Sequence, residues 1–143
     1  GKGSNNVWVC PTGEMLRTEQ GGGAVAMMRP EGCFAVATGH RAYLRGEDLG
    51  DRAPEAAAAE RNRWLRLQEL AAKALDRPGD PVAQMKRMLS DHRTVDDHPV
   101  SAPCRHGGER LGDTQYSVIF DLTAREVHYC GQPCRCEWRT IVL

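Results

Sequence analysis

The sequence predicts an α+β domain in which short strands come first, two helices follow, and strands return at the end. Short β-prone runs bounded by turn residues occupy the N-terminal and C-terminal thirds. A stretch of strong helix formers lies between them, and strands do not alternate with helices along the chain. The 143 residues suffice for one domain, 1–143, and are too few for two comfortable ones.

The N-terminal third contains several predicted strands. Val7–Cys10 is a short β-prone run that ends at turn residues, and Met15–Glu19 can return as its hairpin partner. After three consecutive glycines, Ala24–Met28 and Cys33–Thr38 are two further apolar runs. Because both of these runs are apolar on both faces, we expect strands that are buried on two sides.

Two helices are predicted in the middle of the chain. The first runs from Pro54, a residue suited to a first helical position, to Leu75. Its apolar stripe is expected to face the core, and its basic residues are expected to take much of the remaining surface. Asp80 can cap a second helix that starts at Pro81 and runs to about Leu89. The stripe consists of Leu67, Leu70, Ala71 and Ala74, and the basic residues are Arg61, Arg63, Arg66 and Lys73.

The C-terminal third returns to strands. Residues 116–122 alternate, residues 123–125 make a turn, and Val127 and Tyr129 alternate on the returning strand. Residues 138–143, rich in β-branched and aromatic side chains, are expected to form a final strand. In the first of these strands one face carries Tyr116, Val118, Phe120 and Leu122, and the other carries Ser117 and Ile119.

Charge and hydropathy exclude several classes of protein. Nineteen basic residues balance nineteen acidic ones, so the formal net charge is zero, which argues against a dedicated electrostatic nucleic-acid binder. The longest apolar runs fall well short of a membrane span, and no signal-peptide pattern is visible. We therefore expect a cytoplasmic protein with reduced thiols that binds neither nucleic acid nor membrane.

The apolar content is low for a self-sufficient core. Leu, Ile, Val and Phe together are 25 of the 143 residues, below the ~20% at which such a core becomes doubtful. Disorder would also require a large net charge, which the chain lacks. The chain begins with Gly1 rather than Met. We therefore expect a fragment or subunit that shares its core with something else.

The cysteines and histidines are the first candidates for chemistry. The segment Cys104-Arg105-His106 combines a thiol, a permanent cation and an imidazole, and a fixed positive charge lowers the pKa of a nearby thiol. Cys104 could act as a nucleophile with His40 or His128 as its base, or these could be plain loop residues. The thiols Cys130-x3-Cys134-x-Cys136 could add zinc ligands, but their spacing matches no common zinc pattern. We expect no metal and no other cofactor.

Three parts of the chain follow one another in an order typical of a known family. Gly13–Glu19 is similar to a strand pair that ends in glutamate, and Phe34–His40 to a stretch built around Thr-Asn-His. An arginine-rich helix follows. The third part comprises Ser101–His106, Ser117–Leu122, Ala124-Arg125 and Gly131–Cys134. The succession resembles the C-terminal part of the acyl-coenzyme A:6-aminopenicillanic acid acyltransferase family, cysteine N-terminal-nucleophile hydrolases of isopenicillin-N acyltransferase type.

This resemblance implies an αββα sandwich, of which this chain supplies part. It also implies amide-bond chemistry, in which an acyl group passes through a thioester on cysteine to water or to an amine. In the family, autoproteolysis makes that cysteine the first residue of a subunit, and its own α-amine serves as the base. None of the six cysteines opens this chain. The implied partners are a second polypeptide with an N-terminal cysteine, in a heterodimer, and a small-molecule acyl or amide substrate.

The resemblance also assigns site residues. Gly39 and His40 match catalytic positions, but Gly39 stands where the family has an asparagine and offers only a backbone N–H to an oxyanion. Loss of one such donor typically costs ~10²–10³ in rate. Arg105 matches an arginine that holds the thiolate or a substrate carboxylate, a salt bridge within the fold being the alternative. Substrate contacts are expected from Thr38, Cys104 and His106.

Two other functions stay open at this point. One is a non-catalytic binding or scaffolding homologue of the same fold, which the glycine at position 39 favours. The other is a small zinc-binding protein built on the cysteine and histidine cluster. The sequence therefore leaves enzymatic activity itself open.

Overall fold

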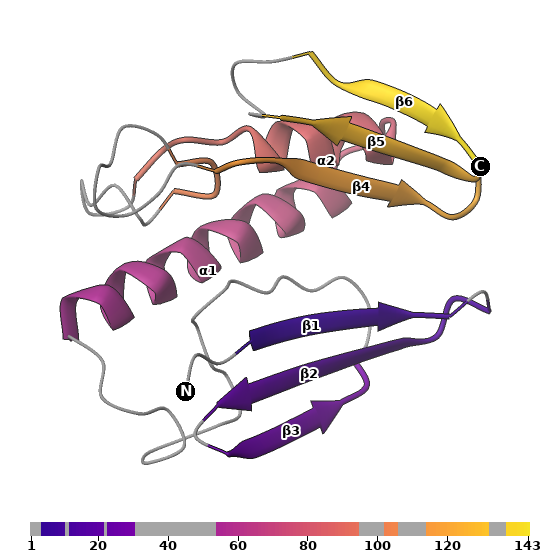
Figure 1. Ribbon diagram of the computed structural model, residues 1–143. Coiled ribbons are helices and arrows are strands. Elements are labelled where there is room, and N and C mark those ends of the chain that lie inside the picture. Colours follow the sequence, from indigo (N-terminus) through magenta and orange to yellow (C-terminus); the bar gives the residue numbers. More distant parts are fainter. Residues whose placement is uncertain are drawn as a thin grey trace.

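The computed structural model describes residues 4–10, 12–21, 23–30, 54–94, 102–105, 114–131 and 137–143. Within these ranges the chain forms two antiparallel three-stranded sheets and two helices, so the predicted α+β class is confirmed (Figure 1). The predicted strand Cys33–Thr38 lies outside the described residues. The strands are β1 (Ser4–Val9), β2 (Met15–Gly21), β3 (Ala24–Met28), β4 (Ser117–Asp121), β5 (Glu126–Cys130) and β6 (Arg139–Val142), and the helices are α1 (Pro54–Leu75) and α2 (Pro81–Leu89).

The first sheet has the order β1–β2–β3, with each strand antiparallel to the next. The predicted hairpin is confirmed, and Val9 pairs with Met15 next to its turn. The Cys10 amide closes the turn by donating a 3.0 Å hydrogen bond to the carbonyl of Glu14. Gly13 takes a φ of 85° in this turn, a left-handed conformation that glycine adopts without a steric penalty.

Strand β3 is buried on one side only. Ala24, Ala26 and Met28 are half-buried, whereas Val25 and Met27 on the opposite face are exposed. The expectation of burial on two sides is therefore wrong for this strand. The physical reason is that, within the described ranges, no helix or second sheet packs extensively on the face that carries Val25 and Met27.

The centre of the first sheet is polar. Arg17 and Glu19 are two residues apart on β2, so they lie on the same face, and their side chains are 4% and 0% exposed. A 2.5 Å contact joins Arg17 Nη2 to Glu19 Oε1. Thr18 points to the other face, where its hydroxyl accepts a 3.3 Å hydrogen bond from the indole of Trp8. Polar pairing therefore replaces apolar packing at the middle of this sheet.

Both predicted helices are confirmed with their bounds. α1 spans Pro54–Leu75, and α2 starts at Pro81 as expected. The Asp80 carboxylate caps α2 by accepting hydrogen bonds from the amides of Val82 and Ala83, at 3.0 and 3.1 Å. These amides have no partner within the helix, so the cap satisfies them.

The buried face of α1 is more polar than predicted. Ala71 of the predicted stripe is buried, and so is Ala59, nearer the start of the helix. Arg63 is buried as well. The side chain of Arg66 is only 11% exposed. The expectation that both arginines lie on the solvent surface is wrong. Arg63 follows Ala59 by four residues and therefore lies on the same face of the helix. Arg66 is enclosed because its guanidinium donates hydrogen bonds to the Asp91 carboxylate, just beyond α2.

The second sheet has the order β4–β5–β6. The predicted turn at 123–125 is confirmed: the Asp121 carboxylate accepts hydrogen bonds from the amides of Thr123 and Ala124, at 3.0 and 2.9 Å. One face of the sheet is buried through Ile119, His128 and Cys130, and helix α2 contacts β4.

The opposite face of this sheet, here called the outer face, is apolar and largely exposed. Phe120 is 66% exposed and Tyr116 is 63% exposed, and the rings of Tyr116 and Tyr129 stack with centroids 6.4 Å apart. Its charged member among the described residues is Arg139, on the edge strand β6. The apolar members of the outer face are Tyr116, Val118, Phe120, Val127, Tyr129 and Ile141.

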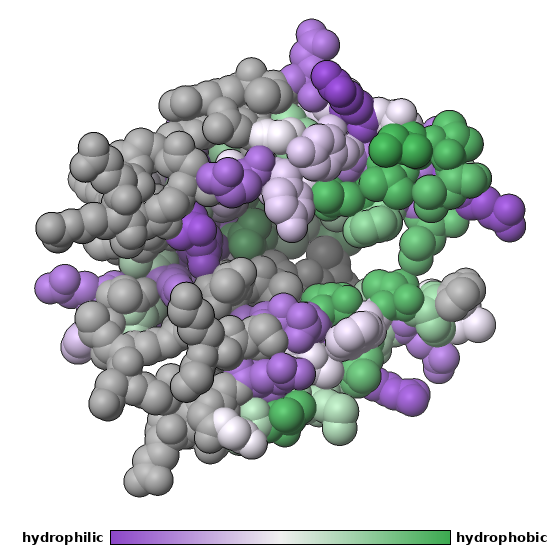
Figure 2. Space-filling model, viewed as in Figure 1, coloured by the Kyte–Doolittle hydropathy of each residue, from purple (hydrophilic) through white to green (hydrophobic). Residues whose placement is uncertain are grey.

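The two sheets are separated by helix. Figure 1 shows α1 running between the first and second sheets, with α2 behind β4 and β5. Figure 2 shows apolar residues gathered at the end of the second sheet where the C-terminus of the chain lies.

Among the described residues, no helix is long and apolar enough to cross a membrane.

Candidate functional site

Two of the six predicted site residues lie in the described part of the chain. These are Cys104 and Arg105, in the segment 102–105 that precedes β4. Thr38, Gly39, His40 and His106 lie outside the described residues. The structure therefore places one corner of the predicted site.

Cys104 is held by its backbone and enclosed by its surroundings. Its amide donates a 2.8 Å hydrogen bond to the carbonyl of Asp91, just beyond α2. Its side chain is 1% exposed. A thiol enclosed to this degree packs as a small apolar group, so reagents in solvent do not reach Cys104 unless the segment opens.

Arg105 is fixed by a reciprocal pair of hydrogen bonds. Its amide donates to the hydroxyl of Thr114 at 3.0 Å, and the Thr114 amide donates to the Arg105 carbonyl at 3.1 Å. The side chain of Arg105 is half-buried. This pairing sets the position from which its guanidinium projects.

A second guanidinium lies close to that of Arg105. Burial lowers the pKa of Arg63, the nearby charge of Arg105 lowers it further, and Glu60 opposes the shift. Arginine stays protonated under ordinary conditions, so the two residues remain cations. The two guanidiniums concentrate positive charge at this point, and the carboxylate of Glu60 offsets part of it.

Asp91 links α1 to the Cys104 segment. Arg66 Nε donates to Asp91 Oδ1 at 3.3 Å, and Arg66 Nη2 donates to Asp91 Oδ2 at 2.7 Å. The hydrogen bonds from Asp91 raise the pKa of Arg66 above its usual value. Since the carbonyl of Asp91 also receives the Cys104 amide, one residue fixes three segments of the chain.

His128, the alternative base to His40, lies on the buried face of the second sheet. Its Nδ1 is 2.9 Å from the Thr140 hydroxyl oxygen, and its Nε2 lies 3.5 Å from Glu126 Oε2. The pairing of β5 with β4 and β6 places His128 beside Ile119 and Thr140. These neighbours hold the ring within the sheet.

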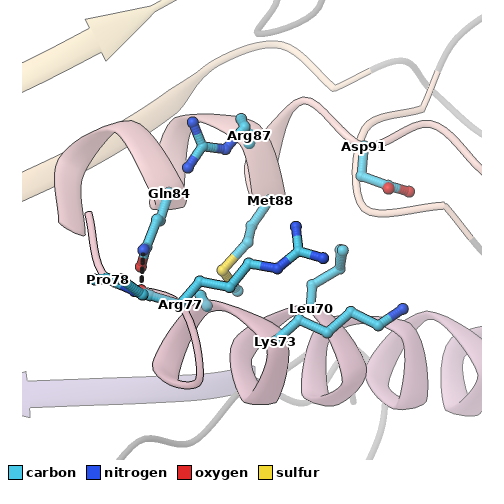
Figure 3. Close-up of a pocket in the computed structure, with 9 residues that line it drawn as sticks. Leu70, Lys73, Arg77, Pro78, Gln84, Arg87, Met88 and Asp91 are labelled. Atoms are coloured by element: carbon cyan, nitrogen blue, oxygen red, sulfur yellow. Dashed lines mark hydrogen bonds between the residues drawn. The ribbon is translucent and has the colours of Figure 1, made fainter. Parts of the chain in front are cut away.

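A cavity of about 300 Å³ opens between the two helices, and sequence reasoning did not find it (Figure 3). Here called the α1–α2 pocket, it depends on the close approach of α1 and α2, which no local pattern encodes. The one available signal was the group of basic residues near the helix ends. The pocket is lined by Leu70, Lys73 and Ala74 of α1, by Arg77 and Pro78 of the following turn, by Gln84, Arg87 and Met88 of α2, and by Asp91.

The turn between β1 and β2 contains a second feature that sequence reasoning missed. Cys10 Sγ lies 2.7 Å from the hydroxyl oxygen of Thr12, and this hydrogen bond lowers the pKa of the thiol. The Thr12 hydroxyl is also 3.4 Å from Glu14 Oε2. A cavity of about 260 Å³, lined in part by Trp8 and Arg29, adjoins the thiol. The spacing Cys-x-Thr was its only sequence signal.

Within the described ranges, no three His, Cys, Asp or Glu side chains lie close enough together to bind a metal ion. His106, Cys134 and Cys136, which belong to the zinc hypothesis, lie outside them. Comparison of the sequence and structure with known protein families, curated proteins and solved structures finds no match.

Proposed function

We propose that this chain supplies part of a cysteine N-terminal-nucleophile amidohydrolase or acyltransferase whose nucleophilic cysteine lies on another segment of polypeptide. The chain would contribute one sheet of an αββα sandwich, its helical layer, and a pocket wall. Thr38, Gly39, His40, Arg105 and His106 are the side of the site that the sequence resemblance assigns to it.

The observation that carries this proposal is the asymmetry of the β4–β6 sheet. Helix α2 contacts β4, and Ile119, His128 and Cys130 are buried on one face. The outer face is apolar and stays exposed, with Phe120 66% and Tyr129 41% accessible. In an αββα sandwich each sheet is covered by helices on one face and by the other sheet on the second face. The outer face has the character of the surface that a second sheet covers.

The described sheets do not supply that cover to each other. Among the described elements, neither sheet packs extensively on the other, and α1 runs between them in Figure 1. In this proposal, the companion sheet comes from a second polypeptide. Packing a companion sheet on the outer face would bury several hundred Å² of apolar surface. Each Å² removed from water stabilises the assembly by ~25 cal/mol.

Arg105 supports the chemistry of the proposal. Cysteine acylation passes through a tetrahedral oxyanion, and the resemblance pairs Arg105 with the thiolate or with a substrate carboxylate. The positive charge of Arg63 and Arg105 favours either anion. The Thr114 hydrogen bonds hold the backbone of Arg105 in place, so the starting point of its side chain is fixed.

The test is an acyl transfer followed on intact proteins. The protein purified from its own source is treated with an octanoyl aryl thioester near neutral pH, and each polypeptide is then weighed by mass spectrometry. The cysteine thiolate attacks the carbonyl carbon, the aryl thiolate leaves, and the acyl group stays on the protein as a thioester. We expect a hydroxylamine-labile acyl adduct on a polypeptide that begins with cysteine, formed faster than any adduct on the accessible Cys10 of this chain.

The matched variants are Phe120→Lys on the outer face and Thr123→Lys in the adjacent exposed turn. Phe120→Lys is expected to release the companion polypeptide and abolish acylation, whereas Thr123→Lys leaves both unchanged. Full amide hydrolysis by the 143-residue chain alone would contradict the proposal.

A second candidate is a non-catalytic subunit of the same fold. Gly39, which lacks the side-chain donor of the family, favours it. In that case the companion polypeptide is still released by Phe120→Lys, but no acyl adduct forms on the companion polypeptide. The same experiment therefore separates the two candidates.

A further inference from the structure

Positive charge dominates the α1–α2 pocket. Its described lining contains three basic side chains, Lys73, Arg77 and Arg87, and one acidic side chain, Asp91. Asp91 is already matched by Arg66 through two hydrogen bonds. The pocket therefore carries more positive charge than its own carboxylate can balance.

The basic residues of the pocket differ in their partners. Lys73 forms an ion pair with Glu69, and Figure 3 shows its side chain extending along α1, away from Arg87. For Arg77 and Arg87, no ion pair with a carboxylate is seen within the described part of the chain. These two guanidiniums are the groups available to a ligand.

The two arginines belong to different elements of the pocket lining, and Figure 3 shows their guanidiniums pointing in different directions. Arg77 lies in the turn after α1, and Arg87 lies in the last turn of α2 (Figure 3). The backbone at Arg77 is fixed, because the Gln84 side-chain amide donates a 2.9 Å hydrogen bond to the Arg77 carbonyl. A planar guanidinium matches the geometry of carboxylate and phosphate oxygens.

The floor of the pocket is apolar. Leu70 and Ala74 contribute from α1, Met88 contributes from α2, and all three are half-buried. A methionine side chain adapts its shape to irregular apolar groups. The volume of about 300 Å³ is at the lower end of the range for small-molecule sites. An apolar floor under two cations suits a ligand with a charged head and an apolar tail.

We propose that the α1–α2 pocket binds an amphiphilic anion, a carboxylate or phosphate head on a short aliphatic tail. Arg77 and Arg87 hold the head, and Leu70, Ala74 and Met88 lie against the tail. This inference does not rest on the proposed function, since the pocket is formed by the two described helices, the turn between them and Asp91 just beyond α2.

The test is a titration of the full chain with octanoate and with octyl phosphate, followed by calorimetry and by amide NMR shifts. We expect saturable binding of at least one of them, with shifts that centre on Arg77, Gln84 and Met88. The ligand that binds more tightly identifies the preferred head. Butyrate and inorganic phosphate, which lack the tail, are expected to bind at least about fivefold more weakly, and octylamine, which has the opposite charge, is expected not to bind.

Substitutions locate the site. Arg77→Gln and Arg87→Gln are each expected to weaken binding about five- to tenfold, because each removes a charged hydrogen-bond donor. Ala74→Leu narrows the floor and is expected to weaken octanoate binding while leaving the helix intact. The matched control is Arg61→Gln, an exposed arginine of α1 outside the pocket, which should leave binding unchanged.

Three results would overturn the inference. They are absence of saturable binding by either anion, equal loss in Arg61→Gln and the pocket variants, and binding of octylamine as tightly as of octanoate. Thermal melts of every variant show whether the fold is retained, and none of these substitutions replaces a buried side chain.

Discussion

Arg66, in the middle of α1, holds the Asp91 carboxylate with two hydrogen bonds of 3.3 and 2.7 Å, across 25 residues of sequence. Both side chains are largely enclosed, at 11% and 14% exposure. The Asp91 carbonyl in turn holds the Cys104 amide. This one pair therefore joins the long helix, the end of α2 and the segment that carries Cys104 and Arg105.

Breaking this pair is expected to destabilise the fold. Arg66→Gln or Asp91→Asn should lower the free energy of unfolding by about 1–3 kcal/mol, because a charged partner is left in a poorly hydrated place. Urea titration measures the effect. Glu69→Gln, which removes an exposed partner of the same arginine, is expected to cost about 0.5 kcal/mol or less. Equal losses for the two pairs would show that enclosure adds nothing.

The buried ion pair in the first sheet is expected to be more sensitive. Glu19→Gln should cost about 3–5 kcal/mol, since it leaves the charge of Arg17 inside the sheet without its carboxylate. The matched control is Arg29→Gln, which breaks the exposed Arg29–Glu14 pair at 3.9 Å and should cost about 0.5 kcal/mol or less. Chemical unfolding of the two variants gives the free energy of unfolding of each. A Glu19→Gln protein as stable as the control would contradict the stabilising role of the buried Arg17–Glu19 pair.

The Cys10 thiol is expected to react before the buried thiols. Its hydrogen bond to Thr12 lowers its pKa, so its thiolate is populated at lower pH than that of an ordinary cysteine. Iodoacetamide should therefore label Cys10 ahead of Cys104 and Cys130, which are each 1% exposed. Peptide mapping after timed labelling gives the order.

The pH dependence of this labelling tests its cause. Thr12→Val removes the hydroxyl and should move the midpoint of the Cys10 labelling profile to higher pH, whereas Thr12→Ser keeps the hydroxyl and should leave it near that of the parent. An identical midpoint in Thr12→Val and the parent would exclude the hydroxyl as the cause.

Glu69 offers a titration with a defined sign. Its hydrogen bonds from Lys73 and Arg66 lower the pKa of its carboxyl. A carboxyl whose pKa is lowered by folding stabilises the fold above its unfolded-state pKa, and the contribution is lost as the pH falls through the lowered value. Lys73→Gln should therefore raise the pKa of Glu69 in a carbon-detected NMR titration. No change would mean that Lys73 does not hold the carboxyl in solution.

Local signals in the sequence were sufficient for most of the described secondary structure. Pro54 and the Asp80-Pro81 pair marked where helices begin, and the turns around Gly13 and Thr123 marked the hairpins. These features depend on a few adjacent residues, so they can be read directly from sequence.

Contacts between residues far apart in the sequence could not be predicted in the same way. Basic residues on a helix favour solvent by default, and the burial of Arg66 follows only from Asp91, 25 positions later. The exposure of Val25 and Met27 depends on whether another layer packs on their face of the sheet. The α1–α2 pocket likewise exists because the turn after α1 brings Arg77 near Arg87. Each of these depends on which elements become neighbours, and one sequence does not encode that locally.

The candidate site was predictable only in part for the same reason. The Cys104-Arg105 pair stood out from its chemistry, but the enclosure of the thiol and the nearby Arg63 follow from the packing of α1. Cys10 was overlooked because its reactivity depends on the conformation of a turn, which places the Thr12 hydroxyl on the sulfur.

Native mass spectrometry of the protein purified from its own source tests the proposed division of the site most directly. We expect a complex in which this 143-residue chain accompanies a second polypeptide whose first residue is cysteine, and we expect Phe120→Lys to dissociate it. A chain that is found alone and still hydrolyses amides would contradict this division of the site.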